Sequence, residues 1–258
     1  MHAHFVLAHP EPRSFNGHLV ASGAAALEAA GWTVTVSDLH AMGFDPCERP
    51  EHYPDRVDPA RFDVQAEQRH ASQAGTLPAA VLEELARMDR ADLLVLQYPM
   101  WWHLPPAMLK GWFDRVLAYG EAYTSSRRFE SGRFTAKRAM LSVTVGTSRA
   151  TYEHDGRSGD IDLMLWPVNF SLAYVGFDVV EPFVAYGVEA GLRYSDPAAV
   201  EARLRGIVEE FRAMLPTVAE RRTIPFNRKS EWGEDGRIKP GAPVHSPFIR
   251  RRKVLDLE

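Results

Sequence analysis

The fold is decided by residues 92–113, which read DLLVLQYPMWWHLPPAMLKGWF. The apolar run from Asp92 to Tyr98 predicts a buried strand, a proline ends it, and a Pro-Pro pair opens an amphipathic helix over Pro106 to Tyr119. Adjacent tryptophans follow the carboxyl end of this strand, which is where open α/β sheets bind flat ligands. A Trp pair often belongs to a core, but a loop at this edge is exposed unless something covers it. The stretch therefore predicts a surface on which a planar, redox-active ring stacks.

Further strands and helices are predicted on both sides of this stretch. Apolar or β-branched runs predict strands at Ala3 to Ala8, Trp32 to Ser37, Ala139 to Val145 and Phe177 to Tyr186. Helical spacing predicts helices at Phe15 to Ala30, Pro78 to Arg90, Ile161 to Ala173 and Asp196 to Leu215. Strand, helix and strand near the amino terminus form a βαβ unit, which implies a parallel sheet with right-handed crossovers. Five strands alternating with helices predict a doubly wound, five-stranded parallel α/β fold of the flavodoxin type.

Two segments depart from this alternation. Asp38 to Leu77 is rich in Pro, His, Arg and Asp, and is too long for a plain connection. We expect an ordered excursion that serves a site or a partner, with disorder as the alternative. Residues 221–258 carry ten Lys/Arg and five Asp/Glu, which makes them +5 and the remainder −9. We expect one domain over 1–215, and over 216–258 a basic C-terminal extension that is an arm rather than a domain. It would lie on the acidic domain or a second subunit, or bind an acidic partner or phosphate.

Composition excludes several classes of protein. The 258 residues are 45% hydrophobic and 25% charged, with a formal charge of −4, which argues against nucleic acid as the partner. One cysteine, Cys47, excludes an intrachain disulfide and fits a reducing cytoplasm. No apolar run approaches the roughly 20 residues that span a bilayer, and no secretion pattern opens the chain. We expect a soluble cytoplasmic protein that is not inserted in a membrane and has no metal site.

The turn after the first strand is the second candidate site. His9, Arg13 and Ser14 stand just before the helix that begins at Phe15. Ser14 can cap that helix, whose free N–H groups and positive dipole end favour an anion such as a cofactor phosphate. No glycine precedes Gly17, so neither a Walker loop nor a GxGxxG turn is present. The alternative is a capped helix with solvated charges.

The third candidate site follows the strand Ala139 to Val145. A Gly-Thr-Ser turn at Gly146 offers hydroxyls and N–H groups to a ring edge, and Tyr152 could donate to negative charge that develops there. His154 and Ser158 follow in the same loop. A lone loop tyrosine is more often structural, so this site depends on the other two.

The three segments together resemble the FAD-dependent NAD(P)H:quinone oxidoreductases, the DT-diaphorase family of the flavodoxin-like superfamily. The resemblance runs from about His4 to Leu215. It is carried by LAHPEPRSFN, GWTVTVSDLHAMGFDP, ADLLVLQYPMWWHLPPAMLKGWFDRV, AYT at 122–124, AMLSVTVG and LWP at 165–167. The resemblance implies a homodimer and a two-electron, ping-pong transfer of hydride from NAD(P)H through FAD to a quinone or another flat electron acceptor.

The resemblance also assigns roles to residues. For the phosphates and ribityl chain of FAD it implies His9, Phe15 and Asn16, with Ser14 in the same turn, and the permanent charge of Arg13 makes that residue a further candidate for cofactor binding. For one face of the flavin ring it implies Pro99, Met100, Trp101, Trp102 and His103. For the other edge it implies Thr144, Gly146, Thr147 and Tyr152. For the substrate pocket it implies Trp102, His103 and Tyr123, with residues of a partner chain.

This chain departs from the family pattern at three positions. Ser158 stands where the family has a His that works with the tyrosine matched by Tyr152, and serine cannot become cationic near neutral pH. Either His154 or Arg157 replaces that His, or charge stabilisation at the ring is weaker. Arg13 replaces a small hydroxyl residue, and either strengthens phosphate binding or points to solvent. Thr147 replaces a second glycine and narrows the pocket at the ring edge.

Two alternative functions remain open. The first is an FMN-dependent azo- or nitroreductase of the same fold. The second is a flavin-binding regulatory subunit of a potassium-efflux transporter, which the basic extension and Ser158 keep open.

Overall fold

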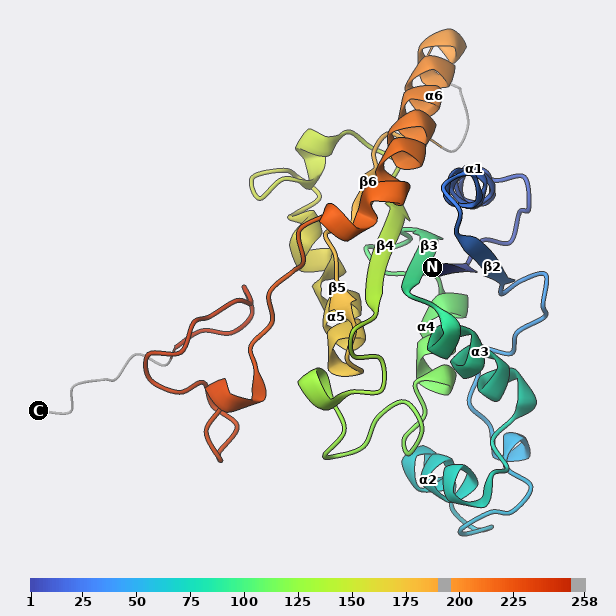
Figure 1. The fold of residues 1–258 in the computed structure, drawn as a ribbon, viewed down its shortest axis with the longest axis vertical. Helices are drawn as coiled ribbons and strands as arrows, with labels where there is room; N and C mark the ends of the chain where they lie inside the picture. Colours follow the sequence, from blue (N-terminus) through green and yellow to red (C-terminus); the bar gives the residue numbers. More distant parts are fainter. Residues whose placement is uncertain (190–195, 252–258) are drawn as a thin grey trace, which may run out of the picture.

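A parallel β-sheet forms the centre of the computed structural model, which describes residues 1–189 and 196–251 (Figure 1). Its strand order is β2-β1-β3-β4-β5, and β6 also pairs with β4. The strands are β1 (His2–Leu7), β2 (Thr33–Asp38), β3 (Leu93–Pro99), β4 (Arg138–Thr144), β5 (Asp178–Val179) and β6 (Phe183–Ala185). The predicted class, a doubly wound α/β fold of flavodoxin type, is confirmed.

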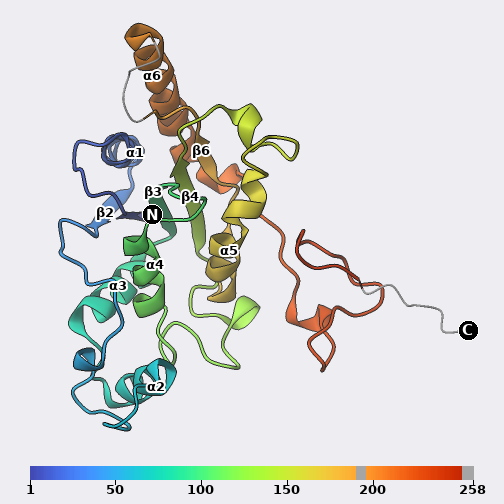
Figure 2. The same cartoon turned by 180° about the vertical axis from the view of Figure 1, so that it is seen from behind.

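Helices cover both faces of the sheet (Figures 1 and 2). The described helices are α1 (Phe15–Ala29), α2 (Val64–Ala74), α3 (Ala79–Arg90), α4 (Ala107–Val116), α5 (Ile161–Tyr174) and α6 (Pro197–Met214), of which α2 lies away from the sheet. Side chains of α1 and α6 pack on one face, and those of α3, α4 and α5 pack on the other. None of the described helices is long and apolar enough to cross a membrane.

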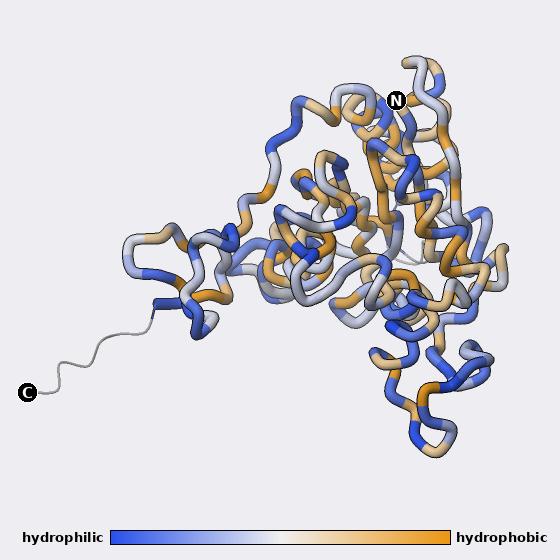
Figure 3. Tube along the Cα trace, turned by 60° about the horizontal axis from the view of Figure 1, so that its bottom comes forward, coloured by the Kyte–Doolittle hydropathy of each residue, from blue (hydrophilic) through white to orange (hydrophobic). Residues whose placement is uncertain are grey.

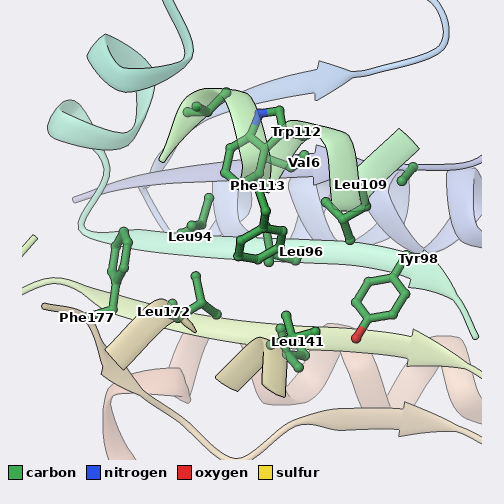
Figure 4. Close-up of a cluster of buried hydrophobic side chains, with 14 of the residues drawn as sticks. Val6, Leu94, Leu96, Tyr98, Leu109, Trp112, Phe113, Leu141, Leu172 and Phe177 are labelled. Carbon is green, nitrogen blue, oxygen red and sulfur yellow. The ribbon is translucent and has the colours of Figure 1, made fainter. Parts of the chain in front are cut away.

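The central strand β3 supplies both cores, as its apolar sequence predicts. All seven of its residues are buried. Leu94, Leu96 and Tyr98 face the same side as Trp112 of α4 (Figure 4), whereas Leu93 packs on the opposite side. Its register with β4 runs to the last residues of both strands. The two strands therefore end level, and their following loops start side by side.

The predicted strand Phe177 to Tyr186 is in fact two short strands, β5 and β6, which corrects the prediction. Ala139 of β4 pairs with Val179, and Ser142 of β4 pairs with Phe183. A step of three residues along β4 therefore corresponds to a step of four along the neighbouring edge. The edge strand thus carries one extra residue, as a β-bulge does. Pro182 lies at the break and has no N–H to donate to the ladder.

The excursion over residues 38–77 is ordered and contains α2, a helix that the sequence reading missed. Asp63 caps its start, and Gly75 ends it with φ of 70°. Gln68 of α2 donates to the carbonyl of Asp114 at 3.1 Å and accepts from the N–H of Tyr119 at 2.9 Å. Tyr119 was predicted to be the last residue of α4, but this helix ends three residues earlier, at Val116. The contact with Tyr119 therefore lies beyond the end of α4. Disorder of this segment, the alternative, is wrong.

The C-terminal extension begins on the sheet and then leaves the body of the molecule. Thr223 forms an antiparallel bridge with Val180, and the N–H of Ile224 donates to the carbonyl of Val179 at 2.8 Å. Beyond this point the chain forms an irregular arm that stands apart from the sheet (Figures 1 and 3). The Phe226 ring anchors the arm, with its centroid 5.1 Å from that of Trp166 in α5.

A buried polar network lies between β1 and β2 and the helices α3 and α4. His4 and Glu84 have no exposed surface, and their Nε2 and Oε2 atoms lie 3.9 Å apart. Ser37 and Trp112 donate to the Glu84 carboxylate at 2.7 and 2.8 Å, and Arg87 donates to it as well. Burial alone would raise the pKa of Glu84, but these polar partners outweigh it and lower that pKa to about 2. The carboxylate is therefore ionised and fully partnered inside the protein.

Candidate functional site

The aromatic loop after β3 is a tight and strained turn. The backbone groups of Trp101 and Leu104 bond to each other in both directions at 3.0 Å. The two residues between them, Trp102 and His103, have φ of 52° and 63°, values that turns of this kind normally give to Asn or Gly. Trp102 is nevertheless 93% exposed. The left-handed backbone of this turn is energetically unfavourable, yet it holds an exposed indole ring at the carboxyl edge of the sheet. Backbone strain of this kind is often found at ligand-binding sites.

Only part of this loop has free backbone donors. The N–H of Met100 donates to the carbonyl of Thr144 at 2.9 Å, and that of Trp101 is used within the turn. Among the described residues, the N–H groups of Trp102 and His103 have no partner. The N–H groups of Trp102 and His103 are therefore the backbone donors that this loop offers to a ligand.

The turn after β1 lies beside the aromatic loop. The ring of His9 is 5.9 Å from that of Trp101 in an edge-on arrangement, and burial lowers the pKa of His9. Its Nδ1 accepts from the N–H of Glu11 at 3.0 Å. Arg13 points to solvent, since its side chain is 93% exposed and its ion-pair partner among the described residues is the equally local Glu11, with Nε 3.4 Å from the carboxylate. His9 thus belongs to the edge that the aromatic loop forms, whereas Arg13 faces away from the protein.

The same turn leaves donors free at the start of α1. Ser14 caps the helix by accepting from the N–H of Gly17 at 3.1 Å. A Cβ on Gly17 would lie 2.5 Å from the carbonyl oxygen of Pro12, so only glycine permits this close turn. Among the described residues, the N–H groups of Phe15 and Asn16 have no partner. Two donors at the positive end of a helix are arranged for an anion.

The side chains of Asn16 and Thr144 point inward rather than to this edge. Asn16 is buried, donates to the Thr144 hydroxyl at 3.1 Å and accepts from Gln97 at 2.8 Å. These bonds tie the first turn of α1 to β3 and β4. Gln97 was missed in the sequence, although one polar residue at the end of an apolar strand is a signal for such a role.

The turn after β4 has open space at its glycine. The nearest atom to a Cβ on Gly146 would be the carbonyl oxygen of Val188, at 3.9 Å. The hydroxyl of Thr147 lies 2.5 Å from that of Thr151, within its own loop. Thr147 therefore braces the loop, and Gly146 leaves room for a ligand atom.

The loop that follows brings Tyr152 near a tyrosine that the sequence reading missed. The ring of Tyr186, which follows β6, lies 6.1 Å from that of Tyr152. Tyr152 and the exposed His154 line one cavity of about 750 Å³. The N–H of Ser158 donates to the carbonyl of Thr151 at 2.9 Å, while its hydroxyl has no partner in the described part of the chain. Tyr186 ends a predicted strand, and carboxyl ends of parallel strands converge, which was the available signal.

Tyr123 lies in a different cavity, of about 610 Å³, which also contacts Leu104 and Pro105 from the end of the aromatic loop. Its ring is 5.5 Å from that of Tyr174 in α5. Trp102 and His103, predicted to share its pocket, do not line this cavity. Within one chain, therefore, the three predicted substrate residues are not brought together.

This fold and edge agree with comparisons to known proteins. A sequence model of the family described as flavodoxin-like fold matches residues 1–210. NAD(P)H dehydrogenase [quinone] 1 of Cavia porcellus is 40% identical over 185 residues, which cover 71% of this chain and 67% of that protein. A Klebsiella pneumoniae structure assigned as a quinone reductase superposes with a TM-score of 0.81 at 32% identity, covering 93% of this chain and 94% of that one. The NAD(P)H:quinone oxidoreductase of Methanothermobacter marburgensis superposes with a TM-score of 0.62 at 30% identity, covering 83% of this chain and 96% of that one.

The protein is thus of the flavodoxin-like class. Within that class, the chain belongs to the family of NAD(P)H dehydrogenases (quinone), which the resemblance in the sequence predicted. This family implies a flavin cofactor. The residues present fit a flavin, because the edge combines an exposed indole at Trp102, free N–H groups at Phe15 and Asn16, and open space at Gly146.

Proposed function

We propose that this chain is an NAD(P)H:quinone oxidoreductase that uses FAD to pass two electrons, as a hydride, from NAD(P)H to a quinone. The strained turn that keeps Trp102 uncovered beside the free start of α1 is the observation that carries the proposal. Bound flavin would supply the redox chemistry, accepting the hydride at N5 and giving it on. The protein would supply binding geometry and electrostatics.

Each part of the edge has a role in this proposal. The N–H groups of Phe15 and Asn16 would bind the cofactor phosphates, helped by the positive end of α1. The Trp102 indole would stack on the ring, with the N–H groups of Trp102 and His103 near its heteroatoms. Tyr152 would donate a hydrogen bond to negative charge on the opposite edge of the ring.

Substrate binding would need a second copy of the chain. Tyr123 and Tyr174 form an aromatic group that Trp102 does not reach within one chain. In a homodimer, Tyr123 and Tyr174 would face the flavin bound by the partner. They would cover NAD(P)H while it donates the hydride and then the quinone that accepts it. Light scattering of the purified protein measures this directly, and a monomer that retains full quinone reduction would contradict it.

The central experiment is a visible spectrum of the purified protein, before and after NADPH. Oxidised-flavin bands that NADPH bleaches and menadione restores are the expected result. Purified protein that holds no flavin after reconstitution, or holds one that NADPH does not reduce, contradicts the proposal. Weak menadione reduction by a bleachable protein would instead favour the regulatory-subunit alternative.

The identity of the flavin is tested separately. We expect FAD, because the resemblance extends from the turn at His9 through the loop at Tyr152. Release of the cofactor by heat and its separation by chromatography distinguish FAD from FMN. Finding FMN would move the assignment to the azo- or nitroreductase alternative.

The cellular location stays a prediction. Cys47 is an exposed free thiol in the structure, which is compatible with a reducing cytoplasm. Fractionation of the cells that produce the protein would test it.

A further inference from the structure

Arg149 and Tyr152 lie on one face of a short helix beside the proposed flavin edge. The 3-10 helix Arg149–Tyr152 follows the turn after β4. Side chains three residues apart in a 3-10 helix eclipse each other. The first and last residues of this helix therefore project in the same direction.

Tyr186 joins these two side chains. The guanidinium of Arg149 lies 4.9 Å from the centroid of the Tyr186 ring, a cation–π distance. The Tyr186 ring is in turn 6.1 Å from that of Tyr152, at an angle of 50°. Arg149, Tyr186 and Tyr152 thus form a continuous cluster built from β6 and the loop after β4.

The other charges near this cluster are mostly negative. Burial raises the pKa of Tyr186, and the carboxylates of Asp162, Glu153 and Asp160 raise it further, whereas Arg149 lowers it. Asp162 itself has a raised pKa, because it is partly buried and lies near Asp160 and Glu181. Without Arg149, Tyr186 and the neighbouring Tyr152 would be subject to the negative electrostatic potential of these carboxylates.

Other cations at this cavity are engaged elsewhere. Arg222 forms an ion pair with Glu181 at 3.2 Å. Arg221 donates to the carbonyls of Glu181 and Pro182. His154 and Arg157, the two replacements predicted from the sequence, are exposed, as Arg149 is, but neither makes a hydrogen bond, ion pair or ring contact with the described residues. Among these cations, Arg149 is the one whose guanidinium lies over the ring of Tyr186 in the described part of the chain.

We propose that Arg149 is a positioning residue that, through Tyr186 and Tyr152, supplies the positive charge at the flavin edge of this chain. The inference rests on the proposed flavin chemistry. A hydride carries two electrons and one proton, so its transfer leaves NAD(P)⁺ and adds one negative charge to the ring. A cation held over Tyr186, whose ring adjoins that of Tyr152, favours that added charge and so raises the reduction potential of the flavin.

The test is the two-electron midpoint potential of the flavin in the holoenzyme. Arg149→Gln should weaken binding of reduced relative to oxidised flavin about tenfold, which lowers the potential by about 30 mV. Arg149→Lys keeps the charge and should recover most of the loss. Arg205→Gln is the control, because Arg205 is an exposed residue of α6 that pairs with Glu201, and its potential should equal that of the wild type.

Several outcomes would overturn the inference. An unchanged potential in Arg149→Gln would do so, as would an equal or larger shift in His154→Gln or Arg157→Gln. A shift in Arg149→Gln that Lys does not reverse would show that the guanidinium only braces the loop. These outcomes differ from failure of the proposed function, in which the wild type itself holds no flavin that NADPH reduces.

Discussion

The interior beside β1 and the carboxyl edge of the sheet differ in how fully their side chains are partnered. In the interior, His4 and Glu84 are fully buried and the carboxylate is bonded by Ser37, Trp112 and Arg87. At the carboxyl edge, Trp102 is exposed in a strained turn. Polar groups that serve the fold satisfy one another, whereas those of a site are left for a ligand.

Unpartnered buried atoms show the same contrast. Gln97 Oε1, Tyr98 OH and Ser142 Oγ are buried without a hydrogen-bond partner among the described residues, and all three belong to the carboxyl halves of β3 and β4. Within the described part of the chain, no buried side-chain atom of the His4–Glu84 network lacks a hydrogen-bond partner. Three of the seven buried atoms without a partner in the described residues therefore lie under the proposed site, and the other four belong to Arg115, Arg127, Asn169 and Arg221.

The largest expected effect is on stability, from the buried His4–Glu84 network. Glu84→Ala should lower the free energy of unfolding by roughly 3–5 kcal/mol, because Arg87 and the Trp112 N–H lose a buried partner. Urea denaturation measures it. Glu83→Ala is the matched control, since this neighbour is exposed and its pair with Arg87 is worth about 1 kcal/mol or less. Equal losses in both variants would show that the network is not structural.

The pH dependence of stability should come next in size. The pKa of Glu84 is about 2 in the fold against 4.5 as its ordinary value. The contribution of a carboxylate with a lowered pKa is complete above pH 4.5 and is lost as the pH falls toward 2. Wild type should therefore lose on the order of 3 kcal/mol more than Glu84→Gln across that window. Parallel curves of unfolding free energy against pH would contradict the assignment.

At the carboxyl edge, the expected effect is on rate rather than on stability. Tyr152→Phe should slow reduction of the flavin by NADPH by on the order of 10²-fold, because one hydrogen-bond donor to developing charge is lost. Stopped-flow absorbance measures the rate, and thermal unfolding should match the wild type. An unchanged rate would remove Tyr152 from the mechanism.

The smallest expected effect distinguishes the interior network from the carboxyl edge most clearly. Trp102→Gly relieves a left-handed backbone that costs about 1 kcal/mol in other residues, so stability should hold or rise slightly. The same change removes the stacking ring, and the flavin dissociation constant should rise about tenfold. Titration with flavin and denaturation with urea give the two values. A fall in both would mean that the indole supports the fold.

Local patterns were enough for most of the architecture. The apolar run of β3 and the Asp196-Pro197 start of α6 depend on neighbours in the chain, and the structure has both as predicted. The split at Pro182 and the helix α2 were missed. The split at Pro182 was missed because it depends on pairing with β4, a distant part of the chain. The helix α2 was missed because its sequence is polar and its hydrophobic periodicity is weak.

The sequence by itself determined the class of fold, the family and the three segments that form the edge, because hydrophobic period, caps and motifs are local properties of the chain. The tertiary structure decided which of their groups are available. Asn16 proved to be bonded to Gln97 and Thr144, and Arg149 proved to stack on Tyr186. These partners are distant in the sequence and meet only because parallel strands bring their carboxyl ends to one edge, so the availability of each group is a property of the folded chain.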